Sequence, residues 1–403
     1  MATLAEVGNG VNIMWVLFCT ILIVLMLAGF AMIEAGNVQR KNSIGILYKN
    51  ILNGAIAVVS FWILGYGFAF GNTKGGFLGV SLYGLAASEF DVGDAATYPL
   101  QFQHFFLQWA YATVAVTIAG SAISERAKIQ TQLILAFATT IWIYPIIAHW
   151  CWGQGWLSPF ANQKSGFLFY GDESNNFIDA AGSGVVLTVG GVLALVGAVA
   201  VGPRKGRFDG KDFKKNNIPM SVLGAMLLWV GWYGFNLAAT RGVVGTAGEL
   251  AGKIAATTTL SAAFSALTMV VVQAASGCWS VNALSSAFIA GLVGISAGCG
   301  VVEMWGAMLI GIGSCIFYMV AVKVLEAMKI DDAVEAFPIF GAAGIWGCLA
   351  VGIFGSDDLA AFAGYYGSSM GFHPFRTGEQ FGVQLVGIIC IVAWTFGWAS
   401  ALF

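Results

Sequence analysis

Charged residues are scarce in this sequence of 403 residues, since Asp, Glu, Lys and Arg together make up only 9% of it. Apolar residues make up 58% and the mean hydropathy is +0.81, whereas soluble domains contain about 25% charged residues. An ordinary water-soluble domain is therefore excluded, and most of the surface must face lipid. The formal net charge of −2 gives no sign of the concentrated basic face that binds nucleic acid.

Signals of catalysis and of metal or disulfide chemistry are also missing. The seven cysteines show none of the paired spacings that are typical of metal sites or of secreted disulfide frameworks. There is no HExxH motif, no pair of intramembrane aspartates and no nucleophile with a base at a usable spacing. We therefore expect no enzyme, no metal site and no cofactor.

Long apolar runs dominate the sequence instead. A helix needs ~20 mostly apolar residues to cross a bilayer, and the runs predict an all-α membrane protein of eleven transmembrane helices. The whole of 1–403 is predicted to form one domain. The runs lie at about 11–36, 44–71, 99–123, 128–152, 180–202, 218–238, 246–272, 278–299, 302–326, 336–355 and 380–403.

Basic residues lie mainly in every second connection between these runs. They are Arg40, Lys41, Arg126, Lys128, Arg204, Lys205, Arg207, Lys211, Lys214, Lys215, Lys323 and Lys329. Cytoplasmic connections of membrane proteins are enriched in Lys and Arg. The pattern therefore predicts an N-terminus outside and a C-terminus inside. The other connections hold only Lys74, Lys164, Arg241 and Arg376 as loop cations.

Two matching segments hint at an inverted repeat of five helices plus five, followed by a C-terminal helix. Asp179 precedes Leu187 by eight residues, and Asp332 precedes Phe340 by eight. Each pair begins a glycine-rich apolar run, as expected where two repeats place equivalent half-helices.

Seven segments resemble, in order and spacing, the motifs of the ammonium transporter (Amt/Mep/Rh) family, and of its Amt branch in particular. They are AGFAMIEAGNVQRKN (28–42), FWILGYGFAFG (61–71), AGSAISERAKI (119–129), IYPIIAHWCWGQGWL (143–157), IDAAGSGVV (178–186), GWYGFN (231–236) and DDAVEAF (331–337). The resemblance implies eleven helices, an outside N-terminus, an inverted repeat and a homotrimer with one pore in each subunit.

In that family an aromatic cage and a hydroxyl hold an ammonium ion at an outer vestibule, where it loses its proton. Aromatic faces attract such a cation by roughly 0.5–2 kcal/mol. The resemblance places the cage tryptophan at Trp152 and the two gate phenylalanines at Tyr111 and Phe235. The alternative role for Trp152 is an interfacial anchor, which we assign to Trp150 and Trp156.

The vestibule serine of the family falls at Ala239, which has no hydroxyl. Thr240, the next residue, is the alternative source of one. The structural aspartate of the family falls at Asp179, which we expect to cap the helix that follows it.

The resemblance puts the two pore histidines of the family at Leu187 and Phe340, which can neither take up a proton nor form a hydrogen bond. We therefore predict an apolar pore lining at mid-membrane, with conduction impaired or altered. The three histidines of the chain, His104, His149 and His373, fall elsewhere, and we expect them to be structural.

Two functions stay open. The chain is either a transporter or channel for ammonium and ammonia, or a non-conducting relative that acts as an ammonium sensor or as a structural subunit of a larger membrane complex. The expected partners are ammonium or ammonia, the lipid bilayer, two further copies of the chain and, for the second function, other proteins of that complex. The sequence does not distinguish the plasma membrane from an organellar membrane.

Overall fold

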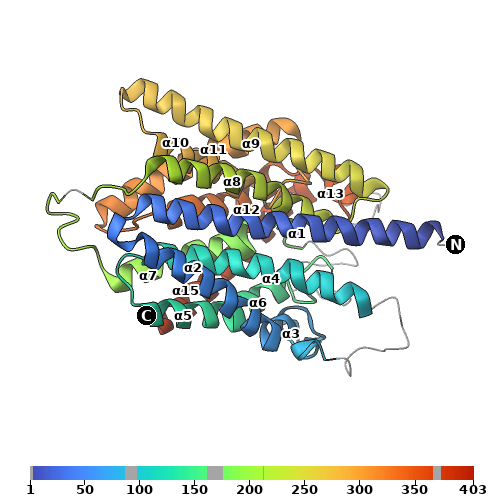
Figure 1. The fold of residues 1–403 in the computed structure, drawn as a ribbon. Helices are drawn as coiled ribbons and strands as arrows, with labels where there is room; N and C mark the ends of the chain where they lie inside the picture. The colour runs from blue at the N-terminus through green and yellow to red at the C-terminus, as the bar shows by residue number, and fades with distance from the viewer. Residues whose placement is uncertain (1–2, 87–97, 161–175, 212, 366–373) are drawn as a thin grey trace.

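Helices make up nearly all of the computed structural model, which describes residues 3–86, 98–160, 176–211, 213–365 and 374–403 (Figure 1). The longer ones are α1 (Leu4–Asn37), α2 (Ser43–Ser60), α4 (Tyr98–Ser121), α5 (Ile129–Ala138), α6 (Tyr144–Cys151), α7 (Val189–Val201), α8 (Ile218–Leu237), α9 (Thr246–Ser276), α10 (Val281–Ile295), α11 (Met304–Ala327), α12 (Ala343–Phe354) and α15 (Glu379–Leu402). Short elements are α3 (Tyr66–Phe70), α13 (Asp357–Phe362), α14 (Pro374–Thr377) and the antiparallel strands β1 (Thr73–Lys74) and β2 (Leu78–Gly79).

Within the described ranges, nine helical segments are long and apolar enough to cross a membrane. They are Leu4–Asn37, Arg40–Phe70, Ile129–Cys151, Ser183–Val201, Ile218–Thr240, Thr246–Ser276, Met304–Ala327, Phe337–Phe354 and Glu379–Leu402. The protein is thus an integral, multi-pass membrane protein. The predicted runs 99–123 and 278–299 coincide with α4 and α10, which lie in the same bundle, and the total of eleven crossings stays a prediction.

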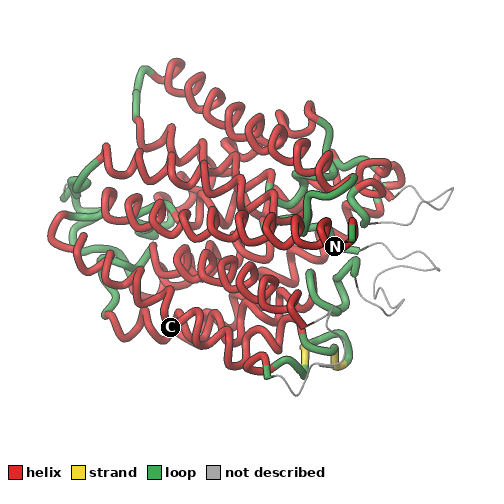
Figure 2. The backbone as a smooth tube through the Cα atoms, turned by 45° about the vertical axis from the view of Figure 1, so that its right-hand side comes forward, coloured by secondary structure: helices red, strands yellow, loops and turns green. Residues whose placement is uncertain are grey.

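The long helices run side by side, and the two chain termini lie at opposite ends of the bundle (Figures 1 and 2). Glycines allow some of these helices to touch through their backbones, as α1 and α8 do. A Cβ atom on Gly29 would lie 2.9 Å from the carbonyl oxygen of Gly224, and one on Gly224 would lie 2.7 Å from that of Gly29. Such small-residue contacts replace the hydrophobic driving force that is absent between helices in lipid.

Four of the membrane-spanning segments contain a turn of π-helix. These turns are Phe61–Gly65, Thr139–Ile143, Ser183–Thr188 and Phe337–Ala342. A π-helical turn inserts an extra residue into the helix and often occurs at functional sites. Two of the four contain Leu187 and Phe340, the positions that the sequence singled out.

The two membrane-spanning segments that contain these turns, Ser183–Val201 and Phe337–Phe354, pack closely against each other. A Cβ atom on Gly191 would overlap the backbone of Gly341, and one on Gly344 would lie 2.6 Å from the carbonyl oxygen of Ser183. The segments therefore meet with almost no side chain between them. This contact fixes the depth of Leu187 and Phe340 relative to each other.

A buried ionic network joins several connections at the end of the bundle that carries the basic residues. The Arg204 guanidinium donates to the Asp331 carboxylate at 2.8 Å and to Glu125, and Arg126 donates to Asp331 at 2.8 Å. Burial alone would raise the pKa of Asp331, but the hydrogen bonds and charge of Arg204 and the charge of Arg126 hold it below its ordinary value of 3.8. The network ties together loops far apart in the sequence.

Candidate functional site

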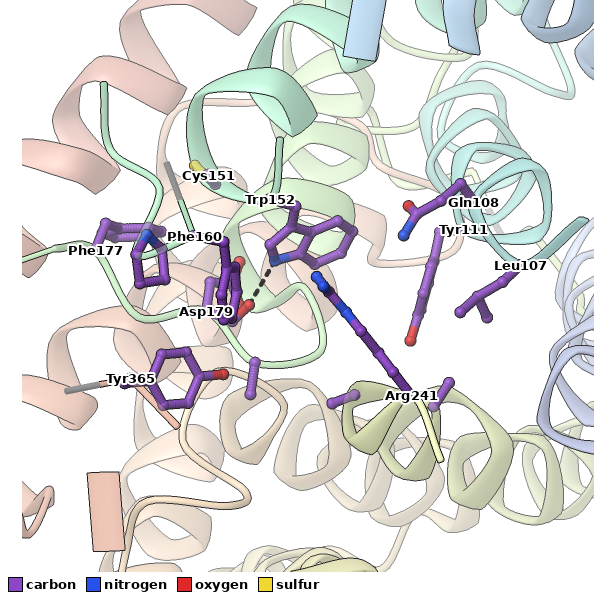
Figure 3. A pocket seen from close by; sticks show the side chains of 14 residues that line it. Leu107, Gln108, Tyr111, Cys151, Trp152, Phe160, Phe177, Asp179, Arg241 and Tyr365 are labelled. Carbon is purple, nitrogen blue, oxygen red and sulfur yellow. Dashed lines mark hydrogen bonds between the residues drawn. The ribbon is translucent and has the colours of Figure 1, made fainter. Parts of the chain in front are cut away.

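An aromatic pocket lies where α4, the end of α6 and the end of α8 come together, and Figure 3 shows the side chains that line it. Its cavity volume is about 40 Å³, which is enough for one small molecule because a water in the liquid takes about 30 Å³. Trp152, Tyr111, Asp179 and Ala239 are among the lining residues. Of the five vestibule and gate residues that the sequence predicted, Trp152, Tyr111 and Ala239 thus line one pocket.

Trp152 is held by two backbone contacts. It is the residue that caps α6, and its backbone N–H donates to the carbonyl oxygen of Ala148 at 2.8 Å. Its indole Nε1–H donates to the backbone carbonyl oxygen of Asp179 at 2.7 Å. Since the only polar atom of the ring is bonded to protein, the indole offers a ligand its aromatic surface alone. The residue is 9% exposed, so Trp152 is a buried wall of the pocket. Trp150, expected as an interfacial anchor, is also buried, at 5% exposure, and its Nε1–H donates to the carbonyl oxygen of Phe77 at 3.0 Å.

Tyr111 lines the pocket beside Trp152, and Phe235 packs against Tyr111 without lining the pocket itself. The Tyr111 hydroxyl donates to the backbone carbonyl oxygen of Phe235 at 2.7 Å, which satisfies the polar group that distinguishes it from phenylalanine. The ring centroids of Tyr111 and Phe235 are 4.8 Å apart at a nearly perpendicular angle, and those of Tyr111 and Trp152 are 5.4 Å apart. Both Tyr111 and Phe235 are buried. The three rings form one aromatic cluster.

Ala239 lines the pocket, but Thr240 does not. The Thr240 hydroxyl accepts a hydrogen bond from Trp15 Nε1 at 3.0 Å and lies within hydrogen-bonding distance of the Leu237 and Gly242 carbonyl oxygens. It is thus occupied by contacts with α1 and with its own turn. The backbone shift that would let Thr240 supply the missing hydroxyl is not seen.

Asp179 acts as a cap for the π-helical turn at Ser183–Thr188. One carboxylate oxygen accepts from the backbone N–H of Gly182 at 2.9 Å, and the other accepts from Gly184 and Val185 at 2.8 Å each. Three amide donors that the helix cannot satisfy by itself are thereby paired. Both oxygens are committed to the backbone, so Asp179 has a structural role and its carboxylate does not point a free charge at the pocket.

Leu187 and Phe340 lie deep in the apolar core. Leu187 is 0% exposed and Phe340 is 6% exposed. The Phe340 ring packs against Phe30 of α1, with 5.6 Å between the ring centroids. The hydroxyl nearest to Leu187 in sequence, Thr188, donates to the backbone carbonyl oxygen of Ser183 at 2.8 Å. Neither Leu187 nor Phe340 has a side-chain atom that can form a hydrogen bond.

Two of the three histidines lie in the described residues, and His149 has a plainly structural role. Its Nδ1 lies 2.9 Å from the carbonyl oxygen of Ala69, and its Nε2 lies 2.9 Å from the Thr73 hydroxyl. The ring is fully buried and joins α6 to α3 and β1. His373 lies outside the described residues.

His104 lies closer to the pocket than its sequence position suggested. Its Nδ1 is 2.9 Å from the Tyr66 hydroxyl, and its Nε2 is 3.4 Å from the amide nitrogen of Gln108, which can only donate. It lines a larger cavity of about 450 Å³ that shares Trp152 with the aromatic pocket. The helical spacing of residues 104, 108 and 111 was the available signal, because such residues share one helix face.

Arg241 is the pocket residue that sequence reasoning missed. It was counted as a loop cation, yet it lines both cavities, and its guanidinium lies next to the Trp152 indole in Figure 3. The available signal was its position, two residues after Ala239. Across the described ranges, no group of three or more His, Cys, Asp or Glu side chains is gathered as for a metal ion.

Comparison with known proteins agrees with the resemblance seen in the sequence. The model of the ammonium transporter family matches residues 14–403. The Ammonium transporter Amt2 of Archaeoglobus fulgidus is 34% identical over 405 residues, which cover 98% of this chain and 82% of that protein. Ammonium transporter 1 member 1 of Arabidopsis thaliana is 34% identical over 388 residues, 92% of this chain and 75% of that protein.

Solved structures show the same fold. A protein described as Sensor Amt Protein superposes with a TM-score of 0.85 and 30% identity, covering 99% of this chain and 93% of that one. Mep2 of Saccharomyces cerevisiae superposes with a TM-score of 0.81 and 27% identity, covering 97% and 84%. With a matching family model over nearly the whole chain and relatives above 30% identity, the protein belongs to the ammonium transporter family.

Proposed function

We propose that this protein binds ammonium at its aromatic pocket and that Leu187 and Phe340 prevent or strongly slow the passage of ammonia. The supporting observation is the contrast between the two sites. Trp152 and Tyr111, which form one aromatic cluster with Phe235, line a small cavity, whereas the mid-membrane positions carry two buried hydrocarbon side chains.

Recognition rests on the aromatic cluster because the other family element, a hydroxyl, is missing at Ala239. A cation above an aromatic face gains about 0.5–2 kcal/mol, depending on how well water is excluded. Trp152 and Tyr111 have their polar atoms bonded to backbone carbonyls. Their ring faces are the surfaces that remain for a cation. We therefore expect weak but selective binding of ammonium and methylammonium.

Restricted passage follows from the surroundings of Leu187 and Phe340. An ammonia molecule there would lose its hydrogen bonds to water without a replacement, at a cost of several kcal/mol. A barrier raised by about 3 kcal/mol slows passage by roughly a hundredfold. The Phe340 ring, packed against Phe30, adds bulk to this lack of polar partners.

Flux measurements on reconstituted protein test this proposal. Uptake of labelled methylammonium into proteoliposomes would be compared for the unmodified protein, the double variant Leu187→His/Phe340→His and empty liposomes. We expect the unmodified protein to match empty liposomes within experimental error and the double variant to exceed them at least tenfold. The double variant Leu187→Ala/Phe340→Ala removes bulk without adding imidazoles, so it separates steric blocking from missing hydrogen bonds. Robust uptake by the unmodified protein would contradict the proposal.

A second candidate function, ammonium sensing without transport, is supported by the similarity to the Sensor Amt Protein structure. A sensor requires that ammonium binds without being transported. The aromatic pocket would provide the binding, and Leu187 and Phe340 would prevent the transport. Ammonium-dependent thermal stabilisation of the unmodified protein, in the absence of flux, would favour a sensor over a purely structural subunit of a larger complex. No stabilisation and no flux would favour the structural role.

The same proposal includes eleven crossings, an outside N-terminus, an inside C-terminus and a homotrimer. The two π-helical segments support the inverted five-plus-five repeat. Asp332 accepts hydrogen bonds from the backbone N–H groups of Phe337 at 2.9 Å and Val334 at 3.4 Å, much as Asp179 caps its own segment. The ionic network of Arg204 and Asp331 gathers the basic connections at one end, which supports the orientation.

A further inference from the structure

Arg241 extends from the end of α8 into the aromatic pocket. It follows the 3-10 turn Ala238–Thr240, and its backbone has a left-handed conformation with φ 53°. Residues other than glycine rarely adopt this conformation. The turn is fixed by a hydrogen bond from the Arg241 backbone N–H to the carbonyl oxygen of Ala238 at 3.0 Å. The chain thus holds an unfavourable backbone geometry at the residue whose side chain enters the pocket.

The Arg241 guanidinium lies among aromatic rings. Its central carbon is 4.8 Å from the centroid of the Phe160 ring, which is a cation–π distance. Figure 3 shows the side chain running past Tyr111, with the guanidinium beside the Trp152 indole. The pocket that would attract ammonium therefore already holds a cation that belongs to the protein.

No described carboxylate forms an ion pair with this cation. Arg241 forms no ion pair within the described part of the chain. The nearest acidic residue of the pocket wall, Asp179, gives both carboxylate oxygens to backbone amides. The Arg241 guanidinium thus lies in the pocket wall without an ion pair among the described residues, and its positive charge opposes the entry of a second cation at short range.

We propose that the Arg241 guanidinium is the resident cation of the aromatic pocket and must leave before any other cation can bind there. This inference rests on the proposed function and names the residue that regulates access to the site. Arg241 is exposed over part of its surface, so the side chain can swing outward without unfolding α8. Ammonium binding would then compete with an internal ligand.

Binding measurements with two small cations test the inference. Methylguanidinium mimics the end of the arginine side chain, and methylammonium mimics the proposed substrate. The variant Arg241→Gly removes the side chain and suits the left-handed backbone, so it is expected to fold. Lys329→Gly is the matched control, because Lys329 is an exposed cation with φ 55° at the other end of the bundle.

Calorimetric titration of the full-length protein in detergent should show methylguanidinium binding to Arg241→Gly at least tenfold more tightly than to the unmodified protein or to Lys329→Gly. The double variant Arg241→Gly/Trp152→Ala should lose this gain, which would place the site at the indole. Equal methylguanidinium affinity in all variants would overturn the inference.

Methylammonium separates this inference from the proposed function. A gain of at least tenfold in Arg241→Gly supports both. Binding to the unmodified protein as tight as to Arg241→Gly would refute the role of Arg241 while supporting ammonium recognition. If methylguanidinium fills Arg241→Gly but methylammonium binds to none of the variants, the resident-cation role stands and the proposed recognition of ammonium fails.

Discussion

Two aspartates, Asp179 and Asp332, cap the π-helical segments that contain Leu187 and Phe340. We expect Asp179→Ala to destabilise the protein more than Asp332→Ala. The Asp179 carboxylate accepts three backbone hydrogen bonds of 2.8–2.9 Å, from Gly182, Gly184 and Val185. Each buried amide left unpaired costs about 1–3 kcal/mol, and bonds to a charged group are at the upper end of the range. Because the three losses are not additive, we expect a total of about 3–5 kcal/mol.

Asp332 provides an internal comparison at the second π-helical segment. It accepts two backbone hydrogen bonds, of which only that from Phe337, at 2.9 Å, is short, while that from Val334 is 3.4 Å. Asp332→Ala should therefore cost about half as much, roughly 1.5–2.5 kcal/mol. Asp179→Asn keeps one acceptor oxygen but turns an amide group toward a donor, so it should fall between the unmodified protein and Asp179→Ala.

Thermal unfolding in detergent, followed by circular dichroism, measures these effects. The exposed loop residue Asp209 serves as the control, and Asp209→Ala should change the free energy of unfolding by less than about 0.5 kcal/mol. The reasoning would be refuted if Asp179→Ala unfolded at the same temperature as this control. It would also be refuted if Asp332→Ala were clearly the more damaging change, since the order follows directly from the number and length of the hydrogen bonds.

Two further predictions concern packing and charge. Gly191→Ala should destabilise the protein by about 1–3 kcal/mol, because its Cβ would overlap the backbone of Gly341; denaturant unfolding checks this. Arg204→Ala should cost about 3–5 kcal/mol by leaving the buried Asp331 carboxylate with fewer partners. The lowered pKa of Asp331 stabilises the protein fully above its ordinary value of 3.8 and less as the pH falls through the lower folded value. The acid unfolding midpoint should therefore rise in Arg204→Ala.

Apolar runs predicted the positions of the long helices well, because a membrane span needs a minimum length of hydrocarbon side chains. They gave no indication of the π-helical turns that carry Leu187 and Phe340. Such a turn depends on contacts from other parts of the chain, here the crossing of Gly191 with Gly341 and the cap by Asp179. The local sequence does not predict these long-range contacts.

For the pocket, the family resemblance predicted which residues meet but not how their polar atoms are used. Trp152, Tyr111 and Phe235 come together as expected. The hydrogen bonds that occupy Thr240 involve Trp15, which is 225 residues away in the sequence. Arg241 was missed because it was counted only as a loop cation, whereas the turn after α8 places its side chain at the pocket while part of the residue stays exposed. Both the bonding of the Thr240 hydroxyl and the position of the Arg241 side chain depend on the tertiary structure.

In the proposed function the pocket and the positions of Leu187 and Phe340 act in series, which decides how binding and flux are related. Arg241 would control whether a cation enters the aromatic pocket, and Leu187 with Phe340 would control what happens after entry. The higher of two successive barriers sets the rate of passage. Removing the Arg241 side chain should therefore raise the occupancy of the pocket by cations without raising flux, as long as Leu187 and Phe340 remain. Tight binding with no flux is thus the expected behaviour of an opened pocket above a closed pore, and it is also the behaviour required of a sensor.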